Sequence, residues 1–407
     1  MTSRQTTQRS RSGISRREAL QAGGVGIAGL MSGLIRPAHA AAQTATPAAT
    51  PAAAASSLPA ELSLALTQAT LQSLAETWTP GAIAGVWMPG QGQWTLAAGL
   101  SDITTGQPPA PDDHYRIAST TKTFVATVIL QLVDEGDLSL DDTLGQFIEG
   151  IPNGDRITLR HLLTMTSGVY NYIYDPLIAV DYEEDPLIAF TPEQVVEIIR
   201  AHGAADFAPG EQAVYSDSNY VLLGLIVEQV TGKTIAEEIT TRLITPLGLT
   251  GTSFATTPDM PEPYLRGYAA GATQAPLRDV TRSNPDVAWA AGAMVSTLAD
   301  QHTWLTAMLT GDLLSPATQA ERLQIIPWVE DPIHAGYGMG VLELGGLQGH
   351  SGGILGYSSW SMQEPASGIT IVTVANEGST EGGAGGSLLF MRLADILFPG
   401  RGFDRVL

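Results

Sequence analysis

The sequence predicts an α/β protein of the α+β kind, in which helices flank an antiparallel sheet built from both ends of the chain. Apolar and β-branched runs at 82–88 and 93–98 predict two early strands. Similar runs at 357–362 and 369–375 predict a late hairpin, because turn residues separate them. Apolar residues at helical spacing dominate 139–280, between the two sets of strands. The strands must therefore meet in one sheet, with a mostly helical domain inserted between them.

The order of these segments sets the domain boundaries that we expect. Residues 58–118 and 290–407 form the predicted sheet domain, and residues 119–289 form the predicted helical domain. A helix near 60–77 begins the sheet domain, and an amphipathic helix near 388–397 ends it.

The first 57 residues are expected to lie outside the fold. Residues 1–40 resemble a twin-arginine signal peptide: Arg16 and Arg17 precede a modest apolar run, and Ala-His-Ala at 38–40 forms a cleavage signal. The run is too short and too rich in glycine for a permanent membrane span. Residues 41–57 are mostly Ala, Thr, Pro and Ser, which is typical of a flexible linker. We therefore expect a periplasmic or extracellular protein exported by the twin-arginine route.

Charge and composition exclude several classes of function. The formal net charge is −21, and because residues 1–40 hold six arginines and one glutamate, their removal takes it to −26. Such a surface repels nucleic acids and anionic membranes. The chain has no cysteine, and no pair of its seven histidines has the spacing of metal ligands. We therefore expect a small-molecule or peptide substrate, with no metal, cofactor, nucleic acid or stable membrane anchor.

A serine and a lysine at helical spacing are the first sign of chemistry. Lys122 is one of only two lysines among the 20 basic residues, and it follows Ser119 by three positions. Apolar residues then continue at helical spacing until Gly136, a typical helix end: Val125, Val128, Ile129, Leu132 and Val133. Ser119 and Lys122 therefore share one helix face. Because a buried lysine can lose its proton, which arginine cannot, this pair predicts a serine nucleophile for acyl transfer.

Two later segments complete a pattern of three motifs. Tyr215 is followed at the second position by Asp217, and a His-Ser-Gly-Gly run begins at His350. Together with Ser119 and Lys122, these segments resemble the Ser-x-x-Lys, Tyr-x-Asn and Lys-Thr-Gly or His-x-Gly motifs of the serine beta-lactamase and penicillin-binding protein superfamily. The resemblance runs from about residue 60 to about 400. It looks nearest to the branch of class C beta-lactamases, Streptomyces-type D-alanyl-D-alanine carboxypeptidases and related esterases.

The resemblance implies roles for eight residues. Catalysis falls to Ser119, Lys122 and Tyr215. The residues expected to bind the substrate are Asp217, His350, Ser351, Gly352 and Gly353. It also implies that the backbone N–H groups of Ser119 and Gly353 form an oxyanion hole.

The chain departs from the family pattern at two positions. Asp217 replaces the usual Asn, and an acid there would keep Lys122 protonated. This favours Tyr215 as the base, acting as a phenolate whose pKa has fallen by roughly three units beside a cation at about 4 Å. A neutral Lys122 is the alternative base. His350 replaces the lysine of beta-lactamases, and its conditional charge predicts weak recognition of carboxylate-bearing beta-lactams.

These observations predict an exported serine hydrolase that works through an acyl-enzyme. A D-alanyl-D-alanine carboxypeptidase-like or esterase-like activity is expected, on a D-alanyl peptide (a cell-wall peptide among the candidates) or on a small ester or amide. The alternatives are a weak beta-lactamase and a non-catalytic ligand-binding protein on the same fold. Residues 349–353 also match the Gly-x-Ser-x-Gly elbow of α/β-hydrolases, but no histidine follows His350, so the chain order excludes that fold.

Overall fold

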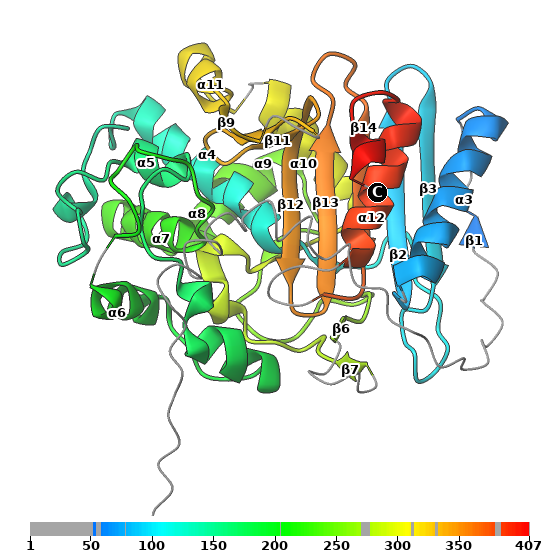
Figure 1. Cartoon of the computed structure of the whole chain (residues 1–407), viewed down its shortest axis with the longest axis horizontal. Helices are drawn as coiled ribbons and strands as arrows, with labels where there is room; N and C mark the ends of the chain where they lie inside the picture. Colours follow the sequence, from blue (N-terminus) through cyan, green and yellow to red (C-terminus); the bar gives the residue numbers. More distant parts are fainter. Residues whose placement is uncertain are drawn as a thin grey trace, which may run out of the picture.

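A computed structural model describes most of the chain (Figure 1). The described residues are 52–53, 58–77, 79–203, 205–269, 277–310, 313–329, 333–378 and 384–406. The expected signal peptide at 1–40 lies outside them, as does the expected linker at 41–57 apart from Ala52–Ala53.

One nine-stranded antiparallel sheet joins the two ends of the chain. Its strand order is β1-β3-β2-β14-β13-β12-β11-β10-β9. The early strand β2 pairs with the late strand β14 along its length, with Ile83 opposite Val374. The strands are β1 (Ala52–Ala53), β2 (Gly81–Met88), β3 (Gly92–Gly99), β9 (Ile326–Val329), β10 (Ala335–Tyr337), β11 (Leu342–Leu344), β12 (Leu347–Ile354), β13 (Tyr357–Gln363) and β14 (Thr370–Ala375). The fold class predicted from the sequence is therefore confirmed.

Helices cover both faces of this sheet. Trp360 on β13 stacks on Phe390 of α12 (Ala384–Leu397), which also packs against α3 (Ala60–Thr77). Gln363 on the same strand bonds to Thr306 of α10 (Leu298–Thr310). Residues three positions apart on a strand point to opposite faces, so α12 and α10 lie on opposite sides of the sheet. Figure 1 shows α12 in front of the strands.

The inserted region packs beside the sheet and is less helical than expected. Its helices are α4 (Thr121–Glu135), α5 (Leu159–Leu163), α6 (Pro192–His202), α7 (Ser218–Thr231), α8 (Ile235–Ile239) and α9 (Thr245–Leu247), and α11 (Pro316–Arg322) lies beyond it. The described residues between 249 and 284 contain only short strands, β5 (Ser253–Phe254), β6 (Tyr268–Ala269) and β7 (Arg278–Asp279). Prolines at 258, 261 and 263 explain the difference, because proline interrupts helical hydrogen bonding.

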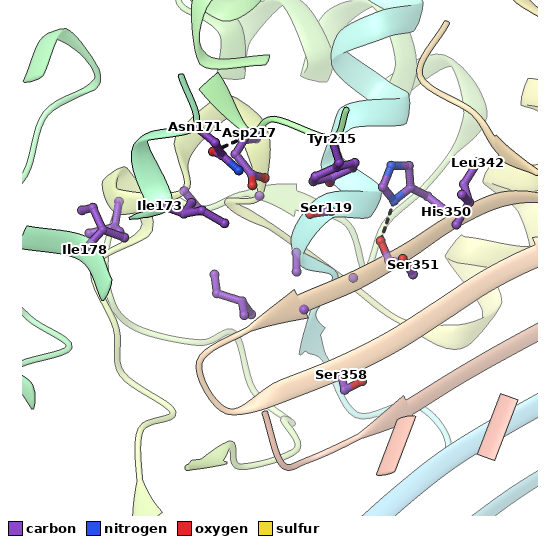
Figure 2. Close-up of a pocket in the computed structure, with 18 of the residues that line it drawn as sticks. Ser119, Asn171, Ile173, Ile178, Tyr215, Asp217, Leu342, His350, Ser351 and Ser358 are labelled. Carbon is purple, nitrogen blue, oxygen red and sulfur yellow. Dashed lines mark hydrogen bonds between the residues drawn. The ribbon is translucent and has the colours of Figure 1, made fainter. Parts of the chain in front are cut away.

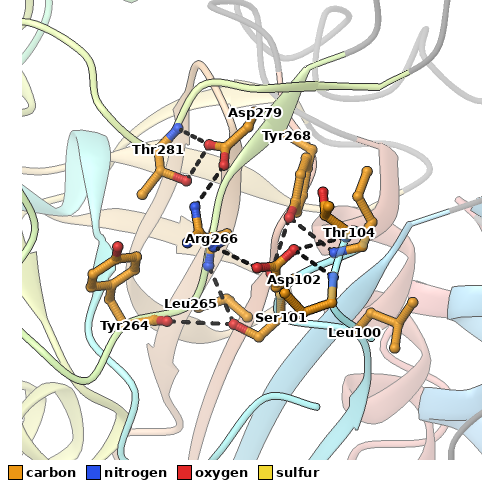
Figure 3. Close-up of polar contacts among 12 residues, drawn as sticks. Leu100, Ser101, Asp102, Thr104, Tyr264, Leu265, Arg266, Tyr268, Asp279 and Thr281 are labelled. Carbon is orange, nitrogen blue, oxygen red and sulfur yellow. Dashed lines mark hydrogen bonds and ion pairs between the residues drawn. The ribbon is translucent and has the colours of Figure 1, made fainter. Parts of the chain in front are cut away.

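A polar network holds this irregular segment against the sheet domain (Figure 3). Arg266 pairs with Asp102 at 3.2 Å and with Asp279 at 2.9 Å. Asp279 accepts hydrogen bonds from the backbone N–H and the hydroxyl of Thr281. The carbonyl of Thr281 in turn accepts from the buried guanidinium of Arg116, at 3.3 Å. Because Arg116 ends β4 (Tyr115–Arg116), three residues before Ser119, the network fixes the chain that enters the site.

Helix α4 forms the buried centre of the molecule, as its apolar spacing predicts. Every residue from Thr121 to Leu130 is buried, and Gly136 ends the helix with a left-handed φ of 83°. Ser119 lies just before it, in the short 3-10 turn η1 (Ala118–Thr120). The helix is therefore a rigid support that presents Ser119 at its N-terminus.

Candidate active site

Ser119 lies in a tight turn between β4 and α4. Ala118, the residue before it, has φ of 47°, an uncommon conformation for a residue with a side chain. The chain is anchored there by the bond from Ile117 N–H to the Met294 carbonyl, at 3.0 Å. A helix N-terminus favours negative charge near Ser119, which suits an attacking oxygen.

Lys122 makes three hydrogen bonds at the bottom of the site. Its Nζ lies 2.9 Å from Ser119 Oγ and 2.6 Å from Asp217 Oδ1. The third bond, 2.8 Å long, goes to the backbone carbonyl of Ala291. The lysine side chain is fully buried. Burial lowers the pKa of Lys122, and Asp217 opposes that shift, so the carboxylate decides how much positive charge Lys122 keeps.

Tyr215 stands next to Ser119, but not in the state expected from the sequence (Figure 2). Its ring lies 5.0 Å from Lys122 Nζ, and its hydroxyl is buried without a hydrogen-bond partner among the described residues. Burial, reinforced by the charge of Asp217, raises the pKa of Tyr215 well above its usual range, although nearby Ser119 acts the other way. The expected phenolate is therefore not the resting state. The physical reason is that burial disfavours the charged phenolate, and the negative charge of Asp217 adds to that effect.

Asp217 occupies the wall of the site immediately before α7. Its side chain makes no capping bond to that helix, and it reaches Lys122 instead. Its backbone N–H donates to Asn171 Oδ1 at 3.2 Å. Asn171 also lines the pocket, and the motif pattern gave no sign of it. Its position just before η3 (Tyr172–Tyr174), after the Ser167-Gly168 turn, is the only signal that the sequence carries.

The third motif lies on β12, which is an edge strand only over its second half. Leu342 on β11 pairs with Gly349, and no strand among the described residues pairs with β12 beyond Gly349 on that side. Backbone groups alternate in direction along a strand, so those of Ser351 and Gly353, like those of Gly349, point away from β13. A Cβ on Gly352 would lie 2.2 Å from the Ile117 carbonyl oxygen. Glycine there allows β12 to pack directly against the turn that holds Ser119.

His350 is neutral, which corrects the expectation of a conditional positive charge. The side chain is buried, and its Nδ1 lies 2.5 Å from the Ser351 carbonyl, so Nδ1 carries the proton and donates it. The Tyr337 hydroxyl then donates to Nε2, at 2.9 Å. Burial, helped by the charge of Lys122, lowers the pKa of His350 to about 3. Both ring nitrogens are occupied by the protein, so His350 shapes the pocket without supplying a charge.

All these groups surround one pocket, with a cavity volume of about 180 Å³. It is lined by seven of the residues predicted from the sequence: Ser119, Tyr215, Asp217, His350, Ser351, Gly352 and Gly353. Figure 2 shows Ile173 and Ile178 at the end of the pocket away from His350 and Leu342. Of the described residues that line the pocket, none is a lysine or arginine, and Asp217 is the one carboxylate. The pocket therefore offers a nucleophile, an apolar end and a single anion.

Comparisons with known proteins agree with this geometry. The family model described as Beta-lactamase matches residues 66–395, which include all three motifs. The chain belongs to the beta-lactamase family. The superfamily inferred from the motifs is thus confirmed, whereas the class C and carboxypeptidase branch stays a prediction.

Three known proteins are similar to this beta-lactamase-family chain in sequence, and two of them also in structure. A D-stereospecific amidohydrolase from Streptomyces sp. is 34% identical, with a TM-score of 0.72 over 82% of this chain and 98% of the other. A D-amino acid amidase from Ochrobactrum anthropi SV3, in complex with L-phenylalanine amide, is 25% identical, with a TM-score of 0.73 over 83% and 98%. The putative penicillin-binding protein PbpX of Bacillus subtilis is 30% identical over 50% of this chain and 49% of its own length. The chain spans about half the length of the curated relatives that it matches.

The described part of the chain contains no candidate metal site and no candidate membrane-spanning helix. No group of three or more His, Cys, Asp or Glu residues there could hold a metal ion. None of the helices described is both long and apolar enough to cross a membrane.

The neutral state of His350 predicts a pH-dependent stability. An exposed histidine has a pKa near 6.5, whereas that of His350 is about 3 in the folded chain. Between these values the unfolded chain binds a proton that the folded chain does not. The contribution of His350 to the free energy of unfolding is therefore complete above about pH 6.5 and falls by about 1.4 kcal/mol per unit below it.

Denaturant unfolding of the wild type and of His350→Gln at pH 7 and pH 5 measures this effect. The wild type is expected to lose about 2 kcal/mol more than the variant between the two pH values. Other titrating groups are common to both proteins and cancel in the comparison. Equal losses would show that His350 titrates normally and is not locked by Tyr337 and Ser351.

Proposed function

We propose that this chain is an exported serine amidohydrolase, which cleaves amides or short peptides of D-amino acids through an acyl-enzyme on Ser119. The observation that carries the proposal is the bond between Ser119 Oγ and Lys122 Nζ, beside a pocket that Ser119 lines and that has an apolar end at Ile173 and Ile178. The names of two structural relatives, a D-stereospecific amidohydrolase and a D-amino acid amidase, support an amide of a D-amino acid as substrate.

The charges of the pocket favour amides over the carboxylate-bearing substrates expected as alternatives. D-alanyl-D-alanine peptides and penicillins both carry a carboxylate, which proteins commonly bind with a cation. The described residues lining this pocket include no lysine or arginine, and His350 is neutral. The formal net charge of −21 adds a general repulsion. A carboxypeptidase or beta-lactamase activity therefore has less support than cleavage of an amide that carries no carboxylate.

The proposed reaction uses the site residues in two steps. Ser119 attacks the amide carbon while Lys122, in its neutral form, accepts the Ser119 proton. The carbonyl oxygen becomes negative and is stabilised by the backbone N–H groups of Ser119 and Gly353. The C–N bond then breaks, and the leaving amine takes a proton through the Tyr215 hydroxyl. Water hydrolyses the acyl-enzyme by the same route in reverse and regenerates Ser119.

Small uncharged esters are a second candidate class of substrate. They undergo the same acyl transfer, and the apolar end of the pocket at Ile173 and Ile178 has no charged group that would exclude them. An ester also has a better leaving group than an amide, so it depends less on proton donation.

Export is proposed on the sequence pattern of residues 1–40, with Arg16 and Arg17 at its centre. This places the enzyme in the periplasm or outside the cell. Fractionation of cells producing the full chain tests the location, and a purely cytoplasmic protein would overturn it.

Covalent labelling tests the function directly. A fluorophosphonate is expected to modify Ser119 and no other serine, and mass spectrometry of the digested protein locates the adduct. Ser119→Ala serves as the control and should remain unlabelled. An unlabelled wild type would favour the non-catalytic binding protein, and an adduct on Ser351 would restore the nucleophile-elbow interpretation.

A further inference from the structure

The three hydrogen bonds of Lys122 describe a site that is not yet ready to react. An ammonium group has three hydrogens, and the three acceptors around Nζ use all of them: Ser119 Oγ, Asp217 Oδ1 and the Ala291 carbonyl. In that state the proton lies on Lys122 and points toward Ser119. The reaction needs the opposite direction, from Ser119 to Lys122. Lys122 must therefore lose one proton before it can act as a base.

Asp217 controls that proton because it is the carboxylate paired with Lys122. The other groups that face Lys122 or its neighbours are the hydroxyl of Ser119, the phenols of Tyr215, Tyr220 and Tyr337, neutral His350, and the buried guanidinium of Arg322. None of these supplies a negative charge at rest. Burial favours the neutral amine of Lys122, and the charge of Asp217 opposes it. Any group that weakens the pairing of Asp217 with Lys122 will therefore let Lys122 lose a proton.

Asp217 also has a free oxygen on the pocket side. Oδ1 binds Lys122, whereas Oδ2 has no hydrogen-bond partner among the described residues. The side chain is 13% exposed, against 0% for Lys122, and it belongs to the pocket lining. Figure 2 shows Asp217 beside Asn171 on the wall above Ser119. A carboxylate oxygen at this place accepts hydrogen bonds, whereas the usual Asn of the motif could also donate one.

We propose that Asp217 is shared between Lys122 and the substrate: its free oxygen binds the protonated α-amine of an aminoacyl amide, and this occupancy converts Lys122 into the base for Ser119. The inference rests on the proposed amidohydrolase function and names its substrate class. When the amine binds, Lys122 gives one proton to solvent, and its lone pair faces Ser119 Oγ. As the bond from Oγ to the substrate carbon forms, the Ser119 proton moves to that lone pair.

A site in which Lys122 and the substrate share Asp217 selects substrates with a free amino group. An N-acylated amide brings no positive charge, and its acyl carbonyl is an acceptor that Asp217 cannot satisfy. It therefore loses binding to Asp217 and leaves Lys122 protonated. A hydrogen bond between charged groups in a partly buried site corresponds to roughly a tenfold to hundredfold difference in affinity.

The first experiment compares D-phenylalanine amide with N-acetyl-D-phenylalanine amide, using the full chain. The value of kcat/KM is expected to be at least about tenfold higher for the free amine. The acidic limb of the pH profile should also lie about one unit lower for the free amine, because the bound cation weakens the pairing of Asp217 with Lys122. Equal kcat/KM values and coinciding pH limbs for the two amides would overturn the inference.

Asp217→Asn separates this role from a merely structural one. The variant alters Lys122 for every substrate, so the readout is the ratio between the two amides. That ratio should fall toward one, and the two pH limbs should coincide. D-phenylalaninol, an amine without a cleavable bond, should release about one proton in a weakly buffered indicator assay with the wild type and markedly less with the variant. A ratio or a proton release unaffected by Asp217→Asn would assign amine recognition to another group.

A neutral ester distinguishes failure of this inference from failure of the proposed function. p-Nitrophenyl acetate has no amine, and a burst of p-nitrophenol reports acylation of Ser119. If the burst occurs and both amides are cleaved equally well, only the role of Asp217 is wrong. If neither the ester nor the amides react, the proposed hydrolase function fails with it.

Discussion

Lys122→Arg is expected to slow acylation of Ser119 by about 10⁴-fold, the upper range for loss of a general base. Arginine keeps the positive charge and can still pair with Asp217, but it cannot be deprotonated in a protein. Lys122 Nζ forms a hydrogen bond of 2.9 Å with Ser119 Oγ, so it is placed to accept the Ser119 proton. Single-turnover cleavage of D-phenylalanine amide measures the effect, because this substrate carries the amine that releases the proton of Lys122.

Two further variants separate loss of the base from loss of the ion pair between Lys122 and Asp217. Lys122→Met leaves Asp217 without its partner in a site where only 13% of the Asp217 side chain is exposed, so the variant should be destabilised. Adding Asp217→Asn should recover stability in thermal unfolding, while acylation stays lost. Near-normal acylation in Lys122→Arg would show that Lys122 serves as a charge and that Tyr215 is the base.

The sequence was sufficient for the parts of the site that depend on local spacing. Ser119 and Lys122 lie one helical turn apart, and a buried helix with Gly136 at its end follows them as expected. The strands β2, β3, β13 and β14 were equally predictable, because each is a local run of apolar and β-branched residues, whereas the short strands β9, β10 and β11 were not predicted. Placing Tyr215, Asp217 and His350 beside Ser119 required the family resemblance, since no local pattern connects these segments.

The charge states could not be predicted because they depend on partners that are distant in the chain. His350 is neutral because it is buried and lies near the charge of Lys122, and no motif marks Tyr337 on β10, which donates to its Nε2. Tyr215 is protonated because its hydroxyl is buried and Asp217 is close. The motif pattern shows that Asp217 would hold Lys122 charged, but the negative charge of Asp217 also acts on Tyr215 and raises its pKa. A residue pattern shows which groups meet, whereas the protonation of each group depends on burial and on all its neighbours.

Tyr215→Phe is expected to lower kcat for an amide by at least about 100-fold, the usual range for losing a proton-transfer group. The Tyr215 hydroxyl is buried, has no hydrogen-bond partner among the described residues, and stands beside Ser119. A buried hydroxyl without a partner costs stability, so its retention at this position fits a partner that arrives with the substrate. The variant should therefore fold normally and unfold at the same temperature as the wild type or slightly above it.

A comparison of substrates with different leaving groups shows whether Tyr215 acts as a proton donor. An amine must gain a proton before the C–N bond breaks, whereas p-nitrophenolate leaves without one. If Tyr215 donates that proton, Tyr215→Phe will reduce amide turnover about 100-fold and the p-nitrophenyl ester burst far less. Equal losses on amide and ester would place Tyr215 in the activation of Ser119, as first expected from the sequence. No loss on either substrate would reduce it to a packing residue, since its ring contacts Trp328 and Tyr337 whether or not the hydroxyl is present.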